Sequence, residues 1–327
     1  MIQAAIAPDL RVDLAPRNPR ELRLRNPVIA ASGCFGYGQE YAGAIDVQRL
    51  GAFVSKGITV RPRSGNPMPR IVETPAGMLN AIGLQNPGIH AFVRKYPPLW
   101  QHWRVPAIVN ISAEAVEDYA MMAAMLDEQP GIAGIEVNVS CPNVASGGFC
   151  FGWDADMTAD VTAAVRASTT LPVVVKLSPG ALDIVSVAQA AEEAGADAVS
   201  LINTLVGLAI DVKRRRPVLA NTTGGLSGPA IKPVALRMVF QVAAAVTIPV
   251  IGMGGIMSLD DMLEFLFAGA SAIQVGTGIF VDPSIPIRLI DDLADWMARN
   301  GVQSVADIVG SALPSRSEPV GSAVAAG

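Results

Sequence analysis

The sequence predicts a single (β/α)₈ barrel, because eight short apolar stretches alternate with helical patterns along its 327 residues. The stretches are rich in β-branched residues and end at polar residues or glycine, as buried parallel strands do. They span residues 27–32, 52–58, 107–111, 134–139, 173–177, 198–203, 249–252 and 272–276. A chain of this length often forms one barrel, so we expect one domain over residues 1–312. A doubly wound sheet is the alternative that gives the same alternation.

Helical periodicity occupies the intervals between these strands. The expected helices span residues 115–128, 155–168, 184–194, 229–246 and 259–268. Ser112 and Ser258 stand where N-caps are expected, because each precedes acidic residues of a first turn. Gly131, Gly195 and Gly269 stand where helices are expected to end.

Three segments depart from a minimal barrel. Residues 10–26 alternate apolar and basic residues and predict a hairpin that caps the bottom of the barrel. Residues 61–87 are rich in Pro and Gly and too long for a simple strand-to-helix connection, so they predict a second hairpin above the site. Residues 313–327 consist largely of Ser, Pro, Gly and Ala, a composition typical of a disordered tail.

Composition narrows the class of protein. The net charge of −5 argues against a nucleic-acid or anionic-membrane partner, and the apolar fraction of 51% allows a large core. The one strong basic run, Lys213-Arg214-Arg215-Arg216, is expected to be a solvated or partner-facing loop. No stretch approaches the ~18 apolar residues of a membrane span, and no signal-peptide pattern is visible. These features predict a soluble cytoplasmic protein.

Cysteine and histidine are scarce. Cys34, Cys141 and Cys150 are too few and too unevenly spaced for a disulfide framework. With no CxxC pair, and only His90 and His102, a zinc or iron–sulfur site within this chain is not expected. The thiols are therefore expected to be reduced.

Polar residues or glycines stand at the end of every predicted strand. Because barrels place their chemistry at the C-terminal ends of their strands, these residues should surround one pocket. Together they favour a large, planar, uncharged-to-anionic ligand. They are Ser32-Gly33, Ser55-Lys56-Gly57, Asn110, Asn138 with Cys141, Lys176, Asn203-Thr204, Gly254-Gly255 and Gly276-Thr277.

The glycines after the last two strands predict a phosphate site, since barrels commonly bind phosphate there. Gly252-Met253-Gly254-Gly255 lacks the third glycine and the later acidic residue of a dinucleotide fingerprint. A mononucleotide is therefore indicated, and flavin mononucleotide (FMN) suits the two lysines. Lys176 is the better candidate to stabilise negative charge on a reduced flavin, and Lys56 could reach flavin and substrate together.

The run Asn138-Val139-Ser140-Cys141-Pro142-Asn143 holds a cysteine between two asparagines at a strand end. A lone cysteine is most often a small buried hydrophobe. Its neighbours at the other strand ends favour a pocket residue instead. As a thiolate, Cys141 is a competent general base if its pKa lies near the working pH.

These motifs together resemble the dihydroorotate dehydrogenases, flavin enzymes of pyrimidine biosynthesis. The matching stretches occur in the family's order and span nearly the whole barrel: residues 55–59, 80–88, 138–143, 176–179, 203–204, 224–228 and 252–256. The resemblance implies an FMN-bearing barrel that oxidises dihydroorotate to orotate on the route to UMP. It also implies that Cys141 removes the proton and FMN receives the hydride.

The resemblance assigns further residues to the site. Those implied to bind substrate are Lys56, Asn80, Ala81, Ile82, Gly83, Leu84, Asn138, Asn203 and Thr204. Those implied to bind FMN are Ser32, Lys56, Gly57, Asn110, Asn138, Lys176, Ile202, Gly228, Gly254, Gly255, Gly276 and Thr277.

Two features narrow the resemblance within the family, one to the soluble class and one to a subgroup of it. Cys141 stands where the membrane-associated members have serine, which implies the soluble class. The glycine-rich loop 144–152 resembles that of the NAD-linked heteromeric subgroup and is expected to be a mobile lid. This resemblance implies a homodimer that associates, as a heterotetramer, with a subunit carrying FAD and an iron–sulfur centre, through which electrons reach NAD⁺. Cys150 receives no role.

Three other functions stay open on the sequence alone. A dihydropyrimidine dehydrogenase-like barrel shares the flavin chemistry, although Asn143 stands where that family typically has histidine. A non-redox phosphate-binding lyase or isomerase could use Lys56 or Lys176 for Schiff-base chemistry. A catalytically silent binding subunit is the third. The colour of the purified protein would separate the yellow flavoproteins from the two colourless alternatives.

Overall fold

A closed barrel of eight parallel strands forms the centre of the computed structural model, which describes residues 7–140, 142–143 and 149–314. Strand β18 pairs with β3, with Ile273 opposite Val28, and this pairing closes the ring. The (β/α)₈, or TIM-barrel, prediction is therefore confirmed, and the doubly wound alternative is wrong because an open sheet has no such pairing. The strands are β3 (Val28–Ala30), β4 (Ala52–Val54), β7 (Ala107–Ile111), β8 (Gly134–Asn138), β11 (Val173–Lys176), β12 (Ala198–Leu201), β17 (Val250–Met253) and β18 (Ala272–Val275).

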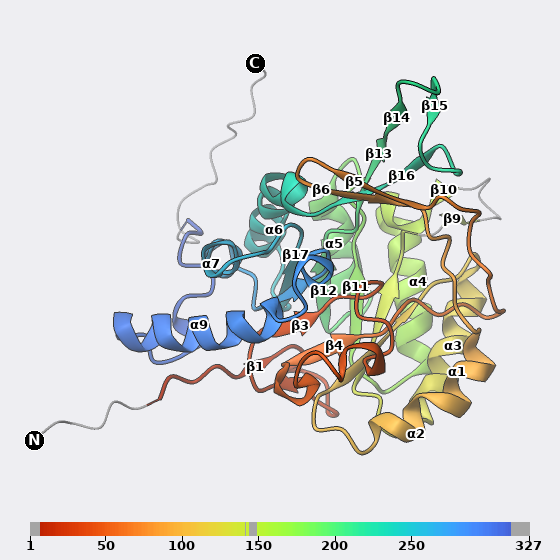
Figure 1. Ribbon diagram of the computed structural model, residues 1–327. Helices are drawn as coiled ribbons and strands as arrows, with labels where there is room; N and C mark the ends of the chain where they lie inside the picture. Colours follow the sequence, from red (N-terminus) through yellow and green to blue (C-terminus); the bar gives the residue numbers. More distant parts are fainter. Residues whose placement is uncertain (1–6, 141, 144–148, 315–327) are drawn as a thin grey trace, which may run out of the picture.

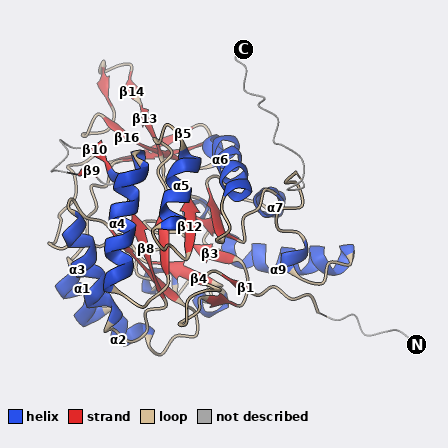
Figure 2. Ribbon diagram, turned by 180° about the vertical axis from the view of Figure 1, so that it is seen from behind, coloured by secondary structure: helices blue, strands red, loops and turns tan. Residues whose placement is uncertain are grey.

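Helices surround the barrel (Figure 2). Their apolar side chains pack against its outer face. The predicted helix 155–168 matches α4, and the prediction 229–246 covers a 3₁₀ turn (Pro229–Ile231) followed by α6. None of the helices among the described residues combines the length and apolar character that crossing a bilayer needs. The helices are α1 (Ile89–Lys95), α2 (Pro97–Trp100), α3 (Val116–Asp127), α4 (Ala155–Ser168), α5 (Ile184–Glu193), α6 (Lys232–Ala245), α7 (Leu259–Phe267), α8 (Gly278–Val281) and α9 (Ile285–Asn300).

The predicted helix boundaries are right in part. Ser258 caps α7, and Asp261 completes a capping box with it. Gly195 and Gly269 adopt positive φ directly after α5 and α7, as predicted. The prediction for Ser112 is wrong: α3 begins later, and the Ser112 hydroxyl instead accepts a hydrogen bond from Asn138 Nδ2 at 3.0 Å. Gly131 lies in the loop beyond α3 and does not end it.

A two-stranded hairpin fills the N-terminal end of the barrel. Strands β1 (Val12–Asp13) and β2 (Arg23–Leu24) pair antiparallel, as the alternation in residues 10–26 predicts. The fully or almost fully buried side chains of the hairpin pack against inward-facing residues of the barrel strands. This apolar plug closes the bottom of the barrel, so polar groups inside the barrel lie in a layer above it. The plug residues are Leu14, Ala15, Leu22 and Leu24.

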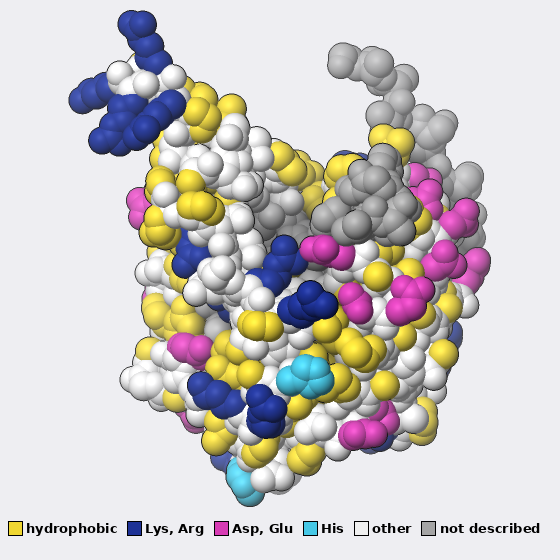
Figure 3. Space-filling model, turned by 90° about the vertical axis from the view of Figure 1, so that its right-hand side faces the viewer, with side chains coloured by type: hydrophobic (Ala, Val, Ile, Leu, Met, Phe, Trp, Pro, Cys, Tyr) yellow, Lys and Arg dark blue, Asp and Glu magenta, His cyan; other side chains and the backbone are white. Residues whose placement is uncertain are grey.

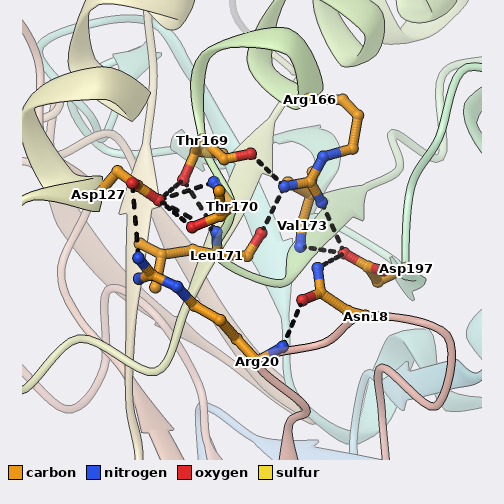
Figure 4. Close-up of polar contacts among 9 residues, drawn as sticks. All are labelled: Asn18, Arg20, Asp127, Arg166, Thr169, Thr170, Leu171, Val173 and Asp197. Atoms are coloured by element: carbon orange, nitrogen blue, oxygen red, sulfur yellow. Dashed lines mark hydrogen bonds and ion pairs between the residues drawn. The ribbon is translucent and has the colours of Figure 1, made fainter.

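Two aspartates tie the loops at this lower end together (Figure 4). Asp127, at the end of α3, accepts hydrogen bonds from Thr169 Oγ1 and the Thr170 amide, each at 2.7 Å. Asp197, before β12, accepts from Arg166 Nη1 at 2.9 Å and from the Val173 amide at 2.8 Å. The network therefore fixes the approach to β11 from both sides.

The Asp127 carboxylate should make stability depend on acid pH. Burial opposes its ionisation, but the hydrogen bonds from Thr169 and Thr170 and the ion pair with Arg20 outweigh burial and lower the pKa to about 2. Because the unfolded-state value is about 3.9, the stabilisation is present above that pH and is lost as pH falls toward 2. Replacing Asp127 with Ala should cost about 2 kcal/mol at pH 7. Urea unfolding of both proteins checks this, and a difference that does not shrink below pH 4 would contradict it.

A four-stranded antiparallel sheet, here called the roof, lies over the C-terminal ends of the barrel strands (Figure 1). Its strands β5 (Ile71–Thr74) and β6 (Gly77–Asn80) confirm the hairpin predicted within residues 61–87. Strands β13 (Leu205–Leu208) and β16 (Thr223–Ser227) complete the roof and were not predicted.

The roof extends into an arm made of β14 (Ile210–Asp211) and β15 (Arg216–Pro217). The basic run Lys213–Arg216 is exposed at the tip of this arm, as the sequence predicts for a solvated or partner-facing loop. Figure 3 shows the cluster of basic side chains at the end of this projection.

Candidate active site

A cavity of about 570 Å³ lies between the ends of the barrel strands and the roof. The structure brings every residue predicted to bind flavin or substrate to its lining, whereas the predicted base Cys141 lies outside the described residues. Ser55, predicted only as a polar strand-end residue, is fully buried and does not line the cavity. Their roles as ligands stay predictions. The predicted residues in the lining are Ser32, Lys56, Gly57, Asn80, Ala81, Ile82, Gly83, Leu84, Asn110, Asn138, Lys176, Ile202, Asn203, Thr204, Gly228, Gly254, Gly255, Gly276 and Thr277.

The floor of the cavity is a layer of polar side chains that point into the barrel above the apolar plug. At its centre is Glu136 of β8, which is fully buried. The Glu136 carboxylate accepts from Asn110 Nδ2 at 2.7 Å, Ser200 Oγ at 2.9 Å and Gln274 Nε2 at 2.8 Å. Lys176 Nζ lies 3.9 Å from the same carboxylate. A buried carboxylate with four partners satisfies the rule that buried charge must be paired.

Lys176 stands at the end of β11, with only 7% of its surface exposed. Its ammonium donates to Ser32 Oγ at 3.1 Å. An ammonium has three donors, so Lys176 can hold Ser32 and still face a ligand in the cavity. It is therefore a fixed positive charge at the floor.

A group of amides and hydroxyls lies on another side of the cavity. Asn203 Nδ2 donates to Ser140 Oγ at 2.9 Å and to Asn138 Oδ1 at 3.3 Å. Asn203 Oδ1 accepts from the Thr204 amide at 2.8 Å. Asn138 Nδ2 in turn donates to Ser112 at 3.0 Å. These bonds hold the amide planes in one orientation before any ligand arrives.

The roof presses closely on this group through two glycines of β16. A Cβ atom on Gly225 would lie 2.0 Å from Thr204 Oγ1, and one on Gly224 would lie 2.7 Å from the Asn80 carbonyl oxygen. Asn80 Nδ2 also donates to the Gly225 carbonyl at 3.3 Å. No other residue type leaves room for this approach, which explains the Gly-Gly pair in residues 224–228.

Two loops with positive-φ glycines and the loop after β18 converge on a further part of the lining. Gly228, Gly254 and Gly255 have φ of 98°, 133° and 78°. A Cβ on Gly255 would lie 2.9 Å from the Gly228 carbonyl oxygen. Thr277 Oγ1 donates to Ser227 Oγ at 2.8 Å and ties the last loop to the roof. Tightly apposed glycine loops leave backbone N–H groups accessible, which suits a phosphate.

Two titratable groups of the lining have shifted pKa values. Burial and the nearby Arg70 lower the pKa of Lys56, against a smaller opposing effect of Glu40. Desolvation raises the pKa of the Cys34 thiol to about 11, although Lys176 opposes the shift. Cys34 therefore stays a neutral thiol at physiological pH and is a poor candidate for a base.

The donors and acceptors of the lining suit a flavin. Lys176 supplies positive charge, and the glycine loops supply N–H groups at the far end of the cavity. Gln274 is buried and lines the cavity, and its Oε1 has no hydrogen-bond partner among the described residues. An orphaned buried acceptor beside a cavity indicates that a ligand donor belongs there.

The sequence did not predict Gln274, which lines the cavity, or Glu136 and Ser200, which lie beneath the lining. Each is a polar residue inside an otherwise apolar strand. Their signal is position: all three occupy inward-facing places near the C-terminal ends of barrel strands, the end at which barrels bind their ligands.

The closed barrel and the polar cavity at the ends of its strands are those of a (β/α)₈-barrel enzyme. Residues 17–297 match the family model for dihydroorotate dehydrogenase. This chain belongs to the dihydroorotate dehydrogenase family, whose members are generally flavin-dependent.

Curated relatives from several bacteria resemble this chain over most of its length. The protein of Pelobacter propionicus is 56% identical over 304 residues, which cover 93% of this chain and 98% of the relative. That of Trichlorobacter lovleyi is 57% identical over 290 residues, or 89% of this chain and 95% of the relative. That of Desulforamulus reducens is 54% identical over 292 residues, or 89% and 96%. All three are named dihydroorotate dehydrogenase B (NAD(+)), catalytic subunit.

Proposed function

We propose that this chain is the catalytic subunit of an NAD-linked dihydroorotate dehydrogenase, which oxidises dihydroorotate to orotate in pyrimidine biosynthesis. The observation that carries the proposal is the shared cavity. The residues expected to bind flavin and those expected to bind substrate are far apart in the sequence, yet they line the same cavity. Family membership and the names of the relatives support the same reaction.

The flavin of this proposal is FMN. Lys176, Ser32 and Asn110 at the floor would hold its ring system, and the loops of Gly254-Gly255 and Gly276-Thr277 would hold its phosphate. When bound, FMN supplies the acceptor for the hydride that leaves the substrate. The positive charge of Lys176 favours the anionic form of a reduced flavin.

The substrate of this proposal is dihydroorotate, which would bind to the amide side chains that the structure already holds in one orientation. Asn80, Asn138, Asn203 and Thr204 would bind the ring amides and the carboxylate of dihydroorotate, and Lys56 would lie between substrate and flavin. Because Asn203 is already held by Ser140 and Thr204, little side-chain freedom remains to be lost on binding.

Cys141 is the proposed general base. Ser140, the residue before it in the sequence, accepts a hydrogen bond from Asn203 Nδ2 at 2.9 Å. Its thiolate would take a proton from one ring carbon while the hydride leaves the neighbouring carbon, and a carbon–carbon double bond forms between them.

The proposal includes a partner subunit. The chain has three cysteines without iron–sulfur spacing and lacks a dinucleotide fingerprint, so FAD, the iron–sulfur centre and the NAD⁺ site are assigned to the partner. The relatives are named catalytic subunits, which supports this division. We further propose a homodimer of this chain within a heterotetramer. We also propose a cytoplasmic location, because the three cysteines are too few and too unevenly spaced for a disulfide framework.

Electron-acceptor assays of the purified chain test this function. We expect a yellow protein that reduces artificial dyes or oxygen when given dihydroorotate, fails with NAD⁺, and produces NADH once the partner is added. A colourless protein would favour the lyase, isomerase or binding-subunit alternatives. Activity with a dihydropyrimidine that lacks the carboxylate, but none with dihydroorotate, would favour the dihydropyrimidine dehydrogenase alternative.

The choice of acceptor separates the subgroups further. Rapid NAD⁺ reduction by the isolated chain would refute the partner subunit. Efficient reduction of fumarate would instead assign the chain to the other soluble subgroup.

A further inference from the structure

Glu136 is a buried carboxylate that has no assigned role in the proposed reaction. It lies beneath the cavity rather than in its lining, whereas its partners Asn110, Lys176 and Gln274 all line the cavity. These partners come from three different strands, β7, β11 and β18. Glu136 can therefore act on a ligand only through the groups that it holds.

The hydrogen bonds of Glu136 determine which atoms the side-chain amides of Asn110 and Gln274 direct toward the cavity. An ionised carboxylate accepts only, so Asn110 and Gln274 must both turn their NH₂ groups toward it. Their oxygens are then the atoms left for other partners. Gln274 Oε1 has none among the described residues, and Asn110 Oδ1 lies 2.9 Å from where a Cβ on Gly57 would stand. The carboxylate thus makes the cavity side of both amides an acceptor for ligand N–H groups.

Glu136 also offsets the charge of Lys176. The Glu136 carboxylate and the Lys176 ammonium lie 3.9 Å apart, with side chains 0% and 8% exposed. Charges at this separation interact strongly when they are shielded from water. An uncompensated lysine would favour a negatively charged ligand more than this paired lysine does.

We propose that Glu136 is a positioning residue that fixes the amides of Asn110 and Gln274 as acceptors and lowers the reduction potential of the bound flavin. This inference rests on the proposed function, because it requires a flavin in the cavity. The carboxylate offsets part of the positive charge that would otherwise stabilise the reduced, anionic flavin. Glu136 thereby favours onward transfer of electrons from the flavin.

The test compares FMN binding and flavin potential in Glu136→Gln and the parent protein. A glutamine offers one acceptor oxygen and one NH₂ group, so it cannot accept from Asn110 on one side and from Ser200 and Gln274 on the other. At least one amide must turn, and Lys176 loses its counter-charge. We expect the Kd of the reconstituted apoprotein for oxidised FMN, measured by fluorescence quenching, to rise about tenfold or more. The midpoint potential of the remaining bound flavin should become more positive.

Ser200→Ala is the matched control. It removes one neutral hydrogen bond to the same carboxylate but keeps the charge and both amide orientations. Its FMN Kd should stay within about threefold of the parent value, and its potential should not move. An equal positive shift of potential in Ser200→Ala would overturn the charge argument, since packing alone would then explain it.

Glu136→Asp keeps the proposal testable if Glu136→Gln does not fold. It retains the negative charge but withdraws the carboxylate by one methylene from its partners. We expect weaker FMN binding with little change in potential, and unchanged FMN binding would overturn the positioning role. A parent protein that binds no FMN would instead refute the proposed function. A parent that binds FMN, with Glu136→Gln equal to it in Kd and potential, would refute this inference alone.

Discussion

Replacing Cys141 with Ala should lower the rate of dihydroorotate-dependent flavin reduction by about 10²-fold or more, while the protein still folds and retains its flavin. The variant loses a proton acceptor but only one small side chain. Stopped-flow absorbance of the flavin band measures the reduction step separately from later electron transfer. A Cys141→Ala protein that reduces its flavin at the parent rate would show that another group is the base.

Two further variants sharpen this test. Cys141→Ser should keep slow activity that rises with pH, because a hydroxyl is a weaker acid than a thiol and must lose its proton to act as base. Cys150→Ala is the control from the same loop region, since Cys150 has no assigned role and burial raises its pKa, which keeps it a neutral thiol. The control should reduce its flavin within about twofold of the parent rate, as is usual when no transition-state contact is removed.

Removing the charge of Lys176 should abolish retention of FMN during purification. Lys176→Met keeps the alkyl stem but loses the ammonium, and we expect FMN affinity to fall about 10²-fold, the loss typical of a hydrogen bond to a charged group. The ratio of flavin to protein absorbance and the Kd from fluorescence quenching measure this. Stoichiometric FMN together with normal turnover would contradict the role of Lys176.

The Lys176 variant needs its own control, because it leaves the buried Glu136 without a counter-charge. An unpaired buried charge of this kind costs about 3–5 kcal/mol, enough to mimic loss of the cofactor through unfolding. The double variant Lys176→Met/Glu136→Gln removes both charges and should recover most of the stability, as thermal unfolding would show. It should still fail to retain FMN, and full retention would assign the effect of the single variant to stability.

The architecture could be predicted because buried strands require apolar residues, which form recognisable runs in the sequence. Each barrel strand is covered by helices on one side and by the barrel interior on the other, so its sequence is an apolar run. Each of the eight predicted runs overlaps an observed strand. The plug was predictable for a related reason: the buried Leu22 and Leu24 alternate with the exposed Arg23 and Arg25. Strand ends then gave most of the cavity lining, since parallel strands deliver their C-terminal residues to one edge.

The roof and the floor were harder to predict for opposite reasons. Strand β16 begins Thr223-Gly224-Gly225, which has low strand propensity because its glycines are selected for close approach to Thr204 and Asn80. Glu136 is surrounded by apolar residues in its strand, and its hydrogen-bond partners come from other strands. Asn110 lies on the neighbouring β7, and the barrel brings Ser200 and Gln274 within 3 Å. Ser112 has the sequence context of an N-cap, but its hydroxyl instead accepts a hydrogen bond from Asn138. In each case a contact distant in sequence overrides the local pattern.

The pairing of β18 with β3 has a consequence for biosynthesis. A ribosome releases the chain from the N-terminus, so residues 272–275 emerge long after the strand at 28–30 that they must join. A nascent chain can form the plug and early strand–helix units, but it cannot complete the ring, and the loop at Gly276-Thr277 that finishes the cavity comes later still. The proposed binding of FMN should therefore follow translation of the chain through residue 277. A product of premature termination before residue 272 would lack both the closing strand and a wall of the cavity.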